Sequence, residues 1–133
     1  MIINKITYCF LFVLTSFGTS FAQDDVVNQL MEHVSSANYR GVSELCGDFV
    51  EVETDKYEET TSKSQVGFIF KEFFTHHPPG NFVYSHIGTS PGGAKYAIAS
   101  YSCKKGTRFL VVVKFKLHAG KLLIDTIKFT PER

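Results

Sequence analysis

The chain has 133 residues, and its 14 lysines and arginines nearly balance 13 aspartates and glutamates, which gives a formal net charge of +1. This length suffices for one domain with a modest hydrophobic core and is too short for two. A protein dedicated to nucleic acid would carry a larger positive charge, so the composition argues against that class of partner.

The first 22 residues have the composition of an export signal. Lys5 gives a positive start, Ile6 to Phe17 is a nearly continuous apolar core, and Ser20-Phe21-Ala22 places small residues at the cleavage position. The apolar run is too short to span a bilayer comfortably, and acidic residues follow it in place of a basic flank. We therefore expect cleavage near Ala22, a single mature domain of residues 23–133 without a membrane span, and a secreted or periplasmic location.

Two stretches have the apolar spacing of amphipathic helices. From Asp24 to Asn38, apolar residues recur every three or four positions, with two aspartates at the positive N-terminal end. Between the two stretches, Val42 to Cys46 predicts a short helix that Gly47 stops. Ser62 to Thr75 repeats the long pattern, and Pro78 forbids its continuation. The apolar side of this last helix is Val66, Ile69, Phe70, Phe73 and Phe74, which would form core or the wall of an apolar pocket.

The middle of the chain predicts two further strands. Phe49 to Val52 alternates with glutamates, which indicates an exposed outer face. Asn81 to Ile87 is a second strand, which begins after a Pro-Pro-Gly turn. Asp55 to Thr61 is polar and turn-like, and Gly88 to Gly93 is a loop.

The last third of the chain predicts three strands, Tyr96 to Cys103, Phe109 to Leu117 and Leu122 to Phe129, joined by glycine-bearing turns. The odd positions of the middle strand are apolar while Lys114 and Lys116 point the other way, so one face is buried. Helices that precede a sheet in so short a chain favour one curved antiparallel sheet closing over helices as a small cone.

Two cysteines, Cys46 and Cys103, remain after cleavage in a protein that we expect to meet an oxidising compartment. A disulfide between them would close a loop of nearly sixty residues and contribute about 4 kcal/mol where geometry permits. Equally, Cys46 in helical surroundings and Cys103 at a strand end would be two separate buried thiols.

Several short motifs of this chain resemble a known family. They are Ser62 to Gln65, Phe73-Phe74, His77-Pro78-Pro79, Phe82, His86, Gly88, Lys95 to Ile98, Gly106, Arg108 and Leu123-Ile124. Together they resemble the domain-of-unknown-function family 4783 (DUF4783), small secreted proteins, over nearly all of the mature chain.

The resemblance implies an α+β fold like that of nuclear transport factor 2, the NTF2-like or cystatin-like cone. Two to three N-terminal helices would pack on a curved, mainly antiparallel sheet, with a pocket at the open end. The resemblance also implies homodimers that pair through the sheet. Proteins of this shape include isomerases, dehydratases and transport adaptors as well as catalytically silent binding domains, so the fold alone selects no activity, and no catalytic residues carry over from the family.

Asp125 is the sharpest candidate for a functional side chain. Its position in the last strand places a carboxylate on the same face as Leu123 and Ile127, which suits a pocket better than a dry core. A desolvated carboxyl there would have a raised pKa and could act as a general acid or base. The alternative is a bulge that shifts the register, so that Asp125 faces water or pairs with Lys114 or Arg108.

His86 would add a second polar group to the pocket if it lies inside with Phe82 and Tyr84, which share its strand face; equally, that face can be the outer one. Tyr101, Phe70 and Phe73 complete the set of pocket candidates. Other motifs carry no chemistry: the two adjacent histidines after the second long helix lack a third metal ligand, and Gly88 to Lys95 departs from the phosphate-binding loop. We expect no cofactor and no metal.

The function most consistent with these observations is a secreted, non-enzymatic domain that binds a small apolar or amphipathic ligand or a protein partner. The rival hypothesis is an enzyme of isomerase or dehydratase type that uses Asp125 with Tyr84 or Tyr101. A third is a structural, envelope-associated module. It is favoured only by a charge asymmetry, since residues 24–72 hold eleven acidic and four basic side chains and residues 73–133 hold two and nine.

Overall fold

The computed structural model describes residues 21–133, with side-chain positions from Asp25 onward. Residues 1–20 of the predicted signal peptide, which include its charged start and apolar core, lie outside the described residues. Within the described range three helices and six strands follow one another. They are α2 (Phe21–Ser35), α3 (Tyr39–Glu44), β1 (Cys46–Glu53), β2 (Glu58–Ser62), α4 (Lys63–His76), β3 (Pro79–Thr89), β4 (Lys95–Cys103), β5 (Arg108–His118) and β6 (Lys121–Pro131).

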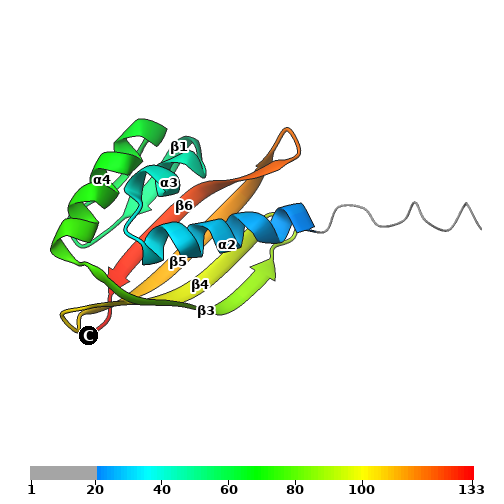
Figure 1. Ribbon diagram of the computed structural model, residues 1–133. Helices are drawn as coiled ribbons and strands as arrows, with labels where there is room; N and C mark the ends of the chain where they lie inside the picture. Colours follow the sequence, from blue (N-terminus) through cyan, green and yellow to red (C-terminus); the bar gives the residue numbers. More distant parts are fainter. Residues whose placement is uncertain (1–20) are drawn as a thin grey trace, which may run out of the picture.

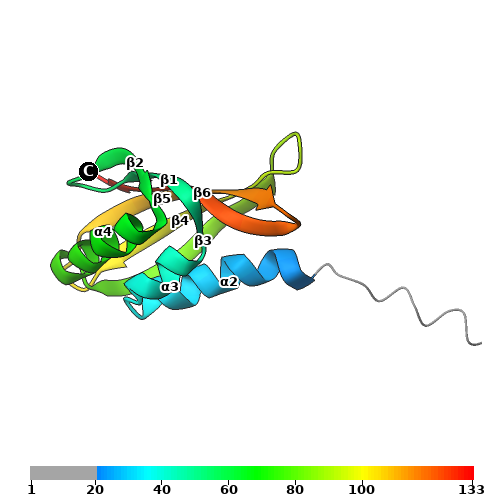
Figure 2. The same ribbon diagram turned by 90° about the horizontal axis from the view of Figure 1, so that it is seen from above.

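The strands form one curved sheet in the order β2-β1-β6-β5-β4-β3, and the helices lie on one of its faces (Figures 1 and 2). β1 runs parallel to β6, and every other neighbouring pair is antiparallel. The three predicted C-terminal strands are β4, β5 and β6, side by side in the sheet. The prediction of an α+β domain with helices packed on a mainly antiparallel sheet is therefore confirmed.

The two long helices bury the side that their apolar spacing predicts. Val26, Val27, Leu30 and Val34 of α2 are buried, as are all five predicted residues of α4. α3 packs between these two helices. α3 contacts α4 at Gly67, where an added Cβ atom would lie 3.5 Å from the Cβ of Ser43, which is an ordinary van der Waals distance.

Strands β1, β2 and β3 differ from the sequence-based expectation. β1 begins at Cys46, which was predicted to end the short helix; that helix instead ends at Glu44. Glu58–Ser62 is strand β2 although the segment from Asp55 was predicted to be a turn, because an edge strand with little buried surface shows no apolar alternation. β3 extends to Thr89, two residues beyond the predicted end, and it forms the opposite edge of the sheet.

An aromatic cluster fills the cone between α4 and strands β4 to β6. The Phe73 ring contacts those of Phe109 and Phe129, with centroids 5.1 and 5.0 Å apart. Phe70 packs on Phe129 at 5.4 Å, and Tyr101 packs on the same ring at 5.4 Å. All five rings are buried, so this part of the cone is core.

Candidate functional site

Three of the predicted pocket residues, Phe70, Phe73 and Tyr101, are buried in this aromatic core, where Phe73 borders a hollow of only about 10 Å³. The sequence-based assignment was wrong for them because an aromatic helix face has the same pattern whether it faces a cavity or another set of rings. The hydroxyl group of Tyr101 donates to the carbonyl of His77, and burial raises the pKa of Tyr101. Its role is therefore structural.

Tyr84 points to the helix side of the sheet, which was one of the two alternatives for its strand face, and its hydroxyl forms a hydrogen bond there. It donates a 2.7 Å hydrogen bond to the carbonyl of Val27 on α2. Burial raises the pKa of Tyr84, so the phenol stays protonated over the whole physiological range. The residue fastens edge strand β3 to α2 and does not line an open pocket.

Asp125 lies outside the cone, which corrects its assignment to the pocket inside it; it borders a separate hollow between β1 and the β5–β6 hairpin. The pairing of β5 with β6 shifts between Lys114 and Phe115, and Asp125 is the extra residue of this bulge. Its carboxylate forms a 3.4 Å ion pair with Lys116, and its side chain is 32% exposed. The structure therefore matches the alternative in which a bulge turns Asp125 outward, except that its partner is Lys116 in place of Lys114 or Arg108.

His86 also lies on the outer face, because a second bulge interrupts β3 at Ser85, between Tyr84 and His86. One extra residue rotates every following side chain to the other face. His86 thus leaves the face that it was predicted to share with Phe82 and Tyr84, and its Nε2 atom lies 3.0 Å from the Tyr96 hydroxyl. The two bulges remove both polar pocket candidates from the cone.

Cys46 and Cys103 are two separate buried thiols, the second of the alternatives considered above. Strands β6 and β5 lie between the strand that begins at Cys46 and the strand that ends at Cys103. Three strand spacings amount to roughly 14 Å, whereas a disulfide needs Cα atoms within about 7 Å. Burial raises the pKa of Cys46 to about 12, which makes this thiol a poor nucleophile.

His77, the residue after α4, connects the end of this helix to the sheet. Nε2 of His77 lies 2.8 Å from a carboxylate oxygen of Asp55, in the connection between β1 and β2.

Among the described residues, no group of three or more histidine, cysteine, aspartate or glutamate side chains is arranged to hold a metal ion. In the same part of the chain, no helix is long and apolar enough to cross a membrane.

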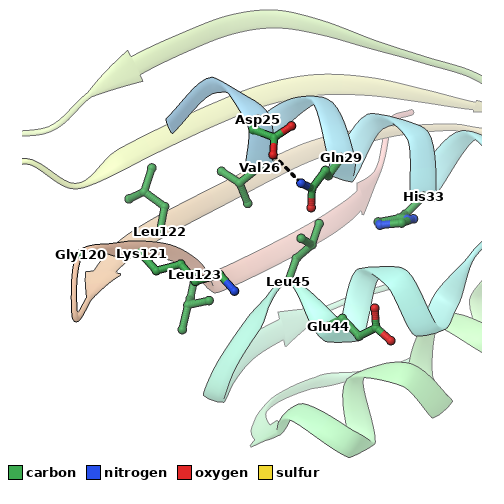
Figure 3. A pocket seen from close by; sticks show the side chains of 10 residues that line it. All are labelled: Asp25, Val26, Gln29, His33, Glu44, Leu45, Gly120, Lys121, Leu122 and Leu123. Carbon is green, nitrogen blue, oxygen red and sulfur yellow. Dashed lines mark hydrogen bonds between the residues drawn. The ribbon is translucent and has the colours of Figure 1, made fainter. Parts of the chain in front are cut away.

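A cleft of about 320 Å³ opens at the opposite end of the molecule, between α2, the junction of α3 with β1, and the β5–β6 hairpin (Figure 3). Its lining residues are Asp25, Val26, Gln29, His33, Glu44, Leu45, Gly120, Lys121, Leu122 and Leu123. This cleft is the candidate functional site.

The floor of the cleft is apolar. Val26 and Leu122 are buried, and Leu45 projects between α2 and the hairpin (Figure 3). An apolar floor loses water readily when hydrocarbon covers it, and each Å² of apolar surface removed from water contributes about 25 cal/mol. The floor therefore favours the hydrocarbon part of a ligand.

The rim of the cleft is polar and contains both signs of charge. Gln29 donates a 2.7 Å hydrogen bond to Asp25 one turn earlier in α2, which fixes both side chains. Nδ1 of His33 lies 3.2 Å from the Asn38 side-chain nitrogen, and a Cβ atom at Gly41 would collide with the His33 ring. The glycine therefore lets α3 approach α2 closely enough to close this side of the cleft.

A tight turn forms the third wall. His118 pairs with Lys121, and the two residues between them, Ala119 and Gly120, have φ angles of 51° and 80°. Positive φ at both central positions is the geometry of a type I′ hairpin turn. The turn directs Lys121 and Leu122 back toward α2.

The sequence-based search missed the cleft residues for a physical reason. Each of them belongs to a regular pattern, such as the apolar stripe of α2 or the alternation of β6, and none carries a motif. The glycine-bearing turn was visible in the sequence, but the cleft forms where the β5–β6 hairpin packs beside α2 and the α3–β1 junction, which is a tertiary relation.

None of the helices in residues 21–133 lies on the opposite face of the sheet (Figures 1 and 2). An outer-face patch lies there, made of Val83, Ile98, Leu110 and Val112 on adjacent strands. Val83 and Leu110 are 49% and 42% exposed. They flank Ser100, whose hydroxyl oxygen is buried and without a hydrogen-bond partner among the described residues.

Comparisons with known proteins agree with this architecture. The family model described as a domain of unknown function (DUF4783) matches residues 27–130. A crystal structure of a DUF4783 family protein from Bacteroides uniformis superposes with a TM-score of 0.73 at 18% identity, and covers 80% of this chain and 96% of its own. Another, from Bacteroides ovatus, has a TM-score of 0.72 at 19% identity, with 79% and 94% covered.

A more distant match extends the same architecture to a wider class. An NTF2-like protein of unknown function from Silicibacter pomeroyi has a TM-score of 0.60 at 11% identity, and covers 84% of this chain and 93% of its own. At such identities the similarity shows the fold alone, which is NTF2-like. A search of curated proteins found no match.

Proposed function

We propose that this chain, which belongs to the DUF4783 family and has its NTF2-like fold, is a non-enzymatic domain that binds a small amphipathic molecule in the cleft of Figure 3. The observation that carries the proposal is the contrast between the two ends of the cone. Aromatic rings fill one end, whereas the other opens as a cleft with an apolar floor and a polar rim.

The size and lining of the cleft support a small ligand. A volume of about 320 Å³ is at the lower end of the range for small-molecule sites. Val26, Leu45 and Leu122 would contact the hydrocarbon part, whereas Asp25 and Lys121 at the rim would orient its polar end. Hydrophobic contact would supply most of the affinity, and the rim would supply selectivity.

The same geometry supports binding in preference to catalysis. An isomerase-like reaction would need an acidic residue inside the cone, but Asp125 is paired with Lys116 on the outer face. The two tyrosines considered as its partners donate to backbone carbonyls and have raised pKa values. Neither is available as a proton donor to a ligand without loss of a structural contact.

The proposed location is the periplasm or the exterior, after cleavage near Ala22. Cleavage there leaves the described lining residues of α2, from Asp25 onward, in the mature protein. The cleft is therefore complete in the exported form. N-terminal sequencing of the protein from its own host would test this, and the proposal predicts Gln23 as the first residue.

Native mass spectrometry of protein purified from its own host tests ligand binding directly. The proposal predicts a fraction of molecules with a constant added mass that denaturation releases. Bare protein throughout, together with no thermal shift from a panel of lipids and metabolites, would contradict it.

A second candidate function is association with another copy through the outer-face patch, since large apolar residues are exposed there. Around the patch the same face carries Glu51 and Glu53 on β1, and Lys114 and Lys116 on β5. Two copies related by a two-fold axis could therefore match opposite charges around an apolar centre. Sedimentation of the wild-type protein should show a dimer. Leu110→Lys should dissociate this dimer, whereas Leu117→Lys, at another exposed leucine, should leave it intact. A wild-type monomer at all concentrations would exclude this candidate.

A further inference from the structure

A second hollow, of about 360 Å³, lies between α3 and α4, which run beside each other in Figure 1. We call it the α3–α4 groove and define it by Tyr39, Arg40, Ser43, Phe68 and Lys71. Gly67 of α4, beside Ser43 of α3, also lines it. The groove shares only Glu44 with the lining of the cleft.

Two cations gather on one aromatic ring at this groove. The Arg40 guanidinium carbon and the Lys71 ammonium nitrogen each lie 5.9 Å from the centroid of the Tyr39 ring. Arg40 comes from α3 and Lys71 from α4, so the Tyr39 ring brings one cation from each helix to the same groove. An aromatic face attracts cations, which explains how like charges remain together here.

Neither cation has a carboxylate partner among the described residues. Glu44 lies one turn after Arg40 and also lines the groove, yet it forms no ion pair with Arg40 or Lys71 within the described part of the chain. Lys56, Lys116 and Lys128, in contrast, each contact an acidic side chain. With Arg40 and Lys71 against the single carboxylate of Glu44, the lining keeps an excess of positive charge, which a bound anion would reduce.

The other wall of the groove is an exposed aromatic side chain. Phe68 is 66% exposed, although Phe70, Phe73 and Phe74 of the same helix are buried in the core. A single exposed apolar residue is ordinary on a protein surface. Here, however, Phe68 borders the same hollow as the Tyr39 ring and the two cations.

We propose that the α3–α4 groove binds a small organic anion in which a carboxylate, sulfonate or phosphate is attached to a hydrocarbon or aromatic body. The anionic group would lie between Arg40 and Lys71, and the body would lie against Phe68 and the Tyr39 ring. This site is separate from the cleft and would take a different class of ligand.

The test is an NMR titration of the mature protein with naphthalene-2-sulfonate, an aromatic anion. The control ligands are 2-naphthylmethanol, which has the ring without the charge, and inorganic sulfate, which has the charge without the ring. The proposal predicts amide shifts confined to residues 39–44 and 63–71 with the sulfonate, and binding at least about tenfold weaker for either control. Equal binding of either control, or shifts centred on another surface, would overturn it.

Exposed-site variants separate the two parts of the groove. Arg40→Gln combined with Lys71→Gln should weaken sulfonate binding about tenfold, whereas Lys104→Gln with Lys105→Gln, at the exposed β4–β5 turn, should leave it unchanged. Phe68→Ser should weaken the binding of naphthalene-2-sulfonate and leave the weak affinity for inorganic sulfate unchanged. Because all these side chains are exposed, the variants should fold, which the amide spectrum would verify. Unchanged sulfonate affinity in both groove variants would refute the site, whatever the cleft binds.

Discussion

The Tyr84 hydroxyl donates a 2.7 Å hydrogen bond to the Val27 carbonyl, and this contact joins edge strand β3 to the helix that forms one wall of the cleft. Val27 lies next to Val26 on the cleft floor, so the position of that floor depends on the contact. The hydrogen bond links residues 57 positions apart in the sequence. It also gives the Tyr84 hydroxyl group, which is largely buried, a partner in place of the water that it loses on folding.

Tyr84→Phe should lower the free energy of unfolding by about 1–2 kcal/mol, because it removes one partly buried hydrogen bond and keeps the ring. Urea denaturation would measure the change. Tyr96→Phe is the matched control, since its hydroxyl contacts His86 on the exposed face, and it should cost less than about 0.5 kcal/mol. Equal losses in the two variants would show that the Val27 contact contributes nothing specific.

Stability should fall in alkaline solution because of buried protonated groups. Burial raises the pKa of Cys46 to about 12. In the unfolded chain a thiol ionises near pH 8.5, so above that pH the unfolded state loses the proton first and becomes relatively more stable. The stabilisation is therefore complete below about pH 8.5 and is lost as the pH rises toward 12, at about 1.4 kcal/mol per pH unit for this group.

Urea unfolding between about pH 8 and pH 10 would measure this slope, and Cys46→Ala is the variant that removes the group. The variant should be less stable at neutral pH, because a buried side chain becomes smaller, but its stability should depend less on pH over this interval. The same slope in both proteins would mean that the thiol is not buried as the structure places it.

Both thiols should be free in the mature protein. Treatment of denatured, unreduced protein with a thiol reagent should label two cysteines per chain, whereas the native protein should react slowly, because Cys46 and Cys103 are buried. Cys103 also has a raised pKa, first because of burial and then because of the nearby Asp55 carboxylate. Recovery of no label without reductant would indicate a disulfide and a different arrangement of the sheet.

Ala119→Gly should stabilise the protein by about 0.5–1 kcal/mol, because Ala119 has a φ of 51°, where a side chain is strained and glycine is not. Thermal unfolding would detect an increase of a few degrees. Ala94→Gly, outside the positive-φ positions of the described chain, is the control and should be neutral or destabilising. A loss of stability at position 119 equal to that at position 94 would argue against the type I′ turn.

The sequence predicted most of the fold, because the fold depends on regular patterns. The apolar spacing of α4 and the alternation of β5 identify buried faces correctly, since Phe109, Val111, Val113 and Phe115 are all buried. β2 could not be found in this way. Hydrogen bonds to β1 hold this polar segment in strand geometry, although its side chains are not buried. Its sequence therefore shows no alternation of apolar and polar residues.

The candidate site could not be predicted, because strand alternation counts residues and cannot detect an extra one. The bulges at Ser85 and Asp125 reverse the faces of His86 and Asp125, the two polar groups assigned to the pocket. Nothing local in the sequence marks either bulge. The cleft, in turn, depends on how the β5–β6 hairpin packs beside α2, which only the folded structure defines.

The most direct test of ligand binding at the cleft compares two tryptophan variants on adjacent positions of α2. Gln29 is half-buried and lines the cleft, so Gln29→Trp should fill it with an indole ring, whereas Asn28 faces solvent and Asn28→Trp should leave it open. Both proteins would be purified from the native host and examined by native mass spectrometry. Our account predicts a bound small molecule in the wild type and in Asn28→Trp and none in Gln29→Trp; the same ligand retained by Gln29→Trp would contradict it.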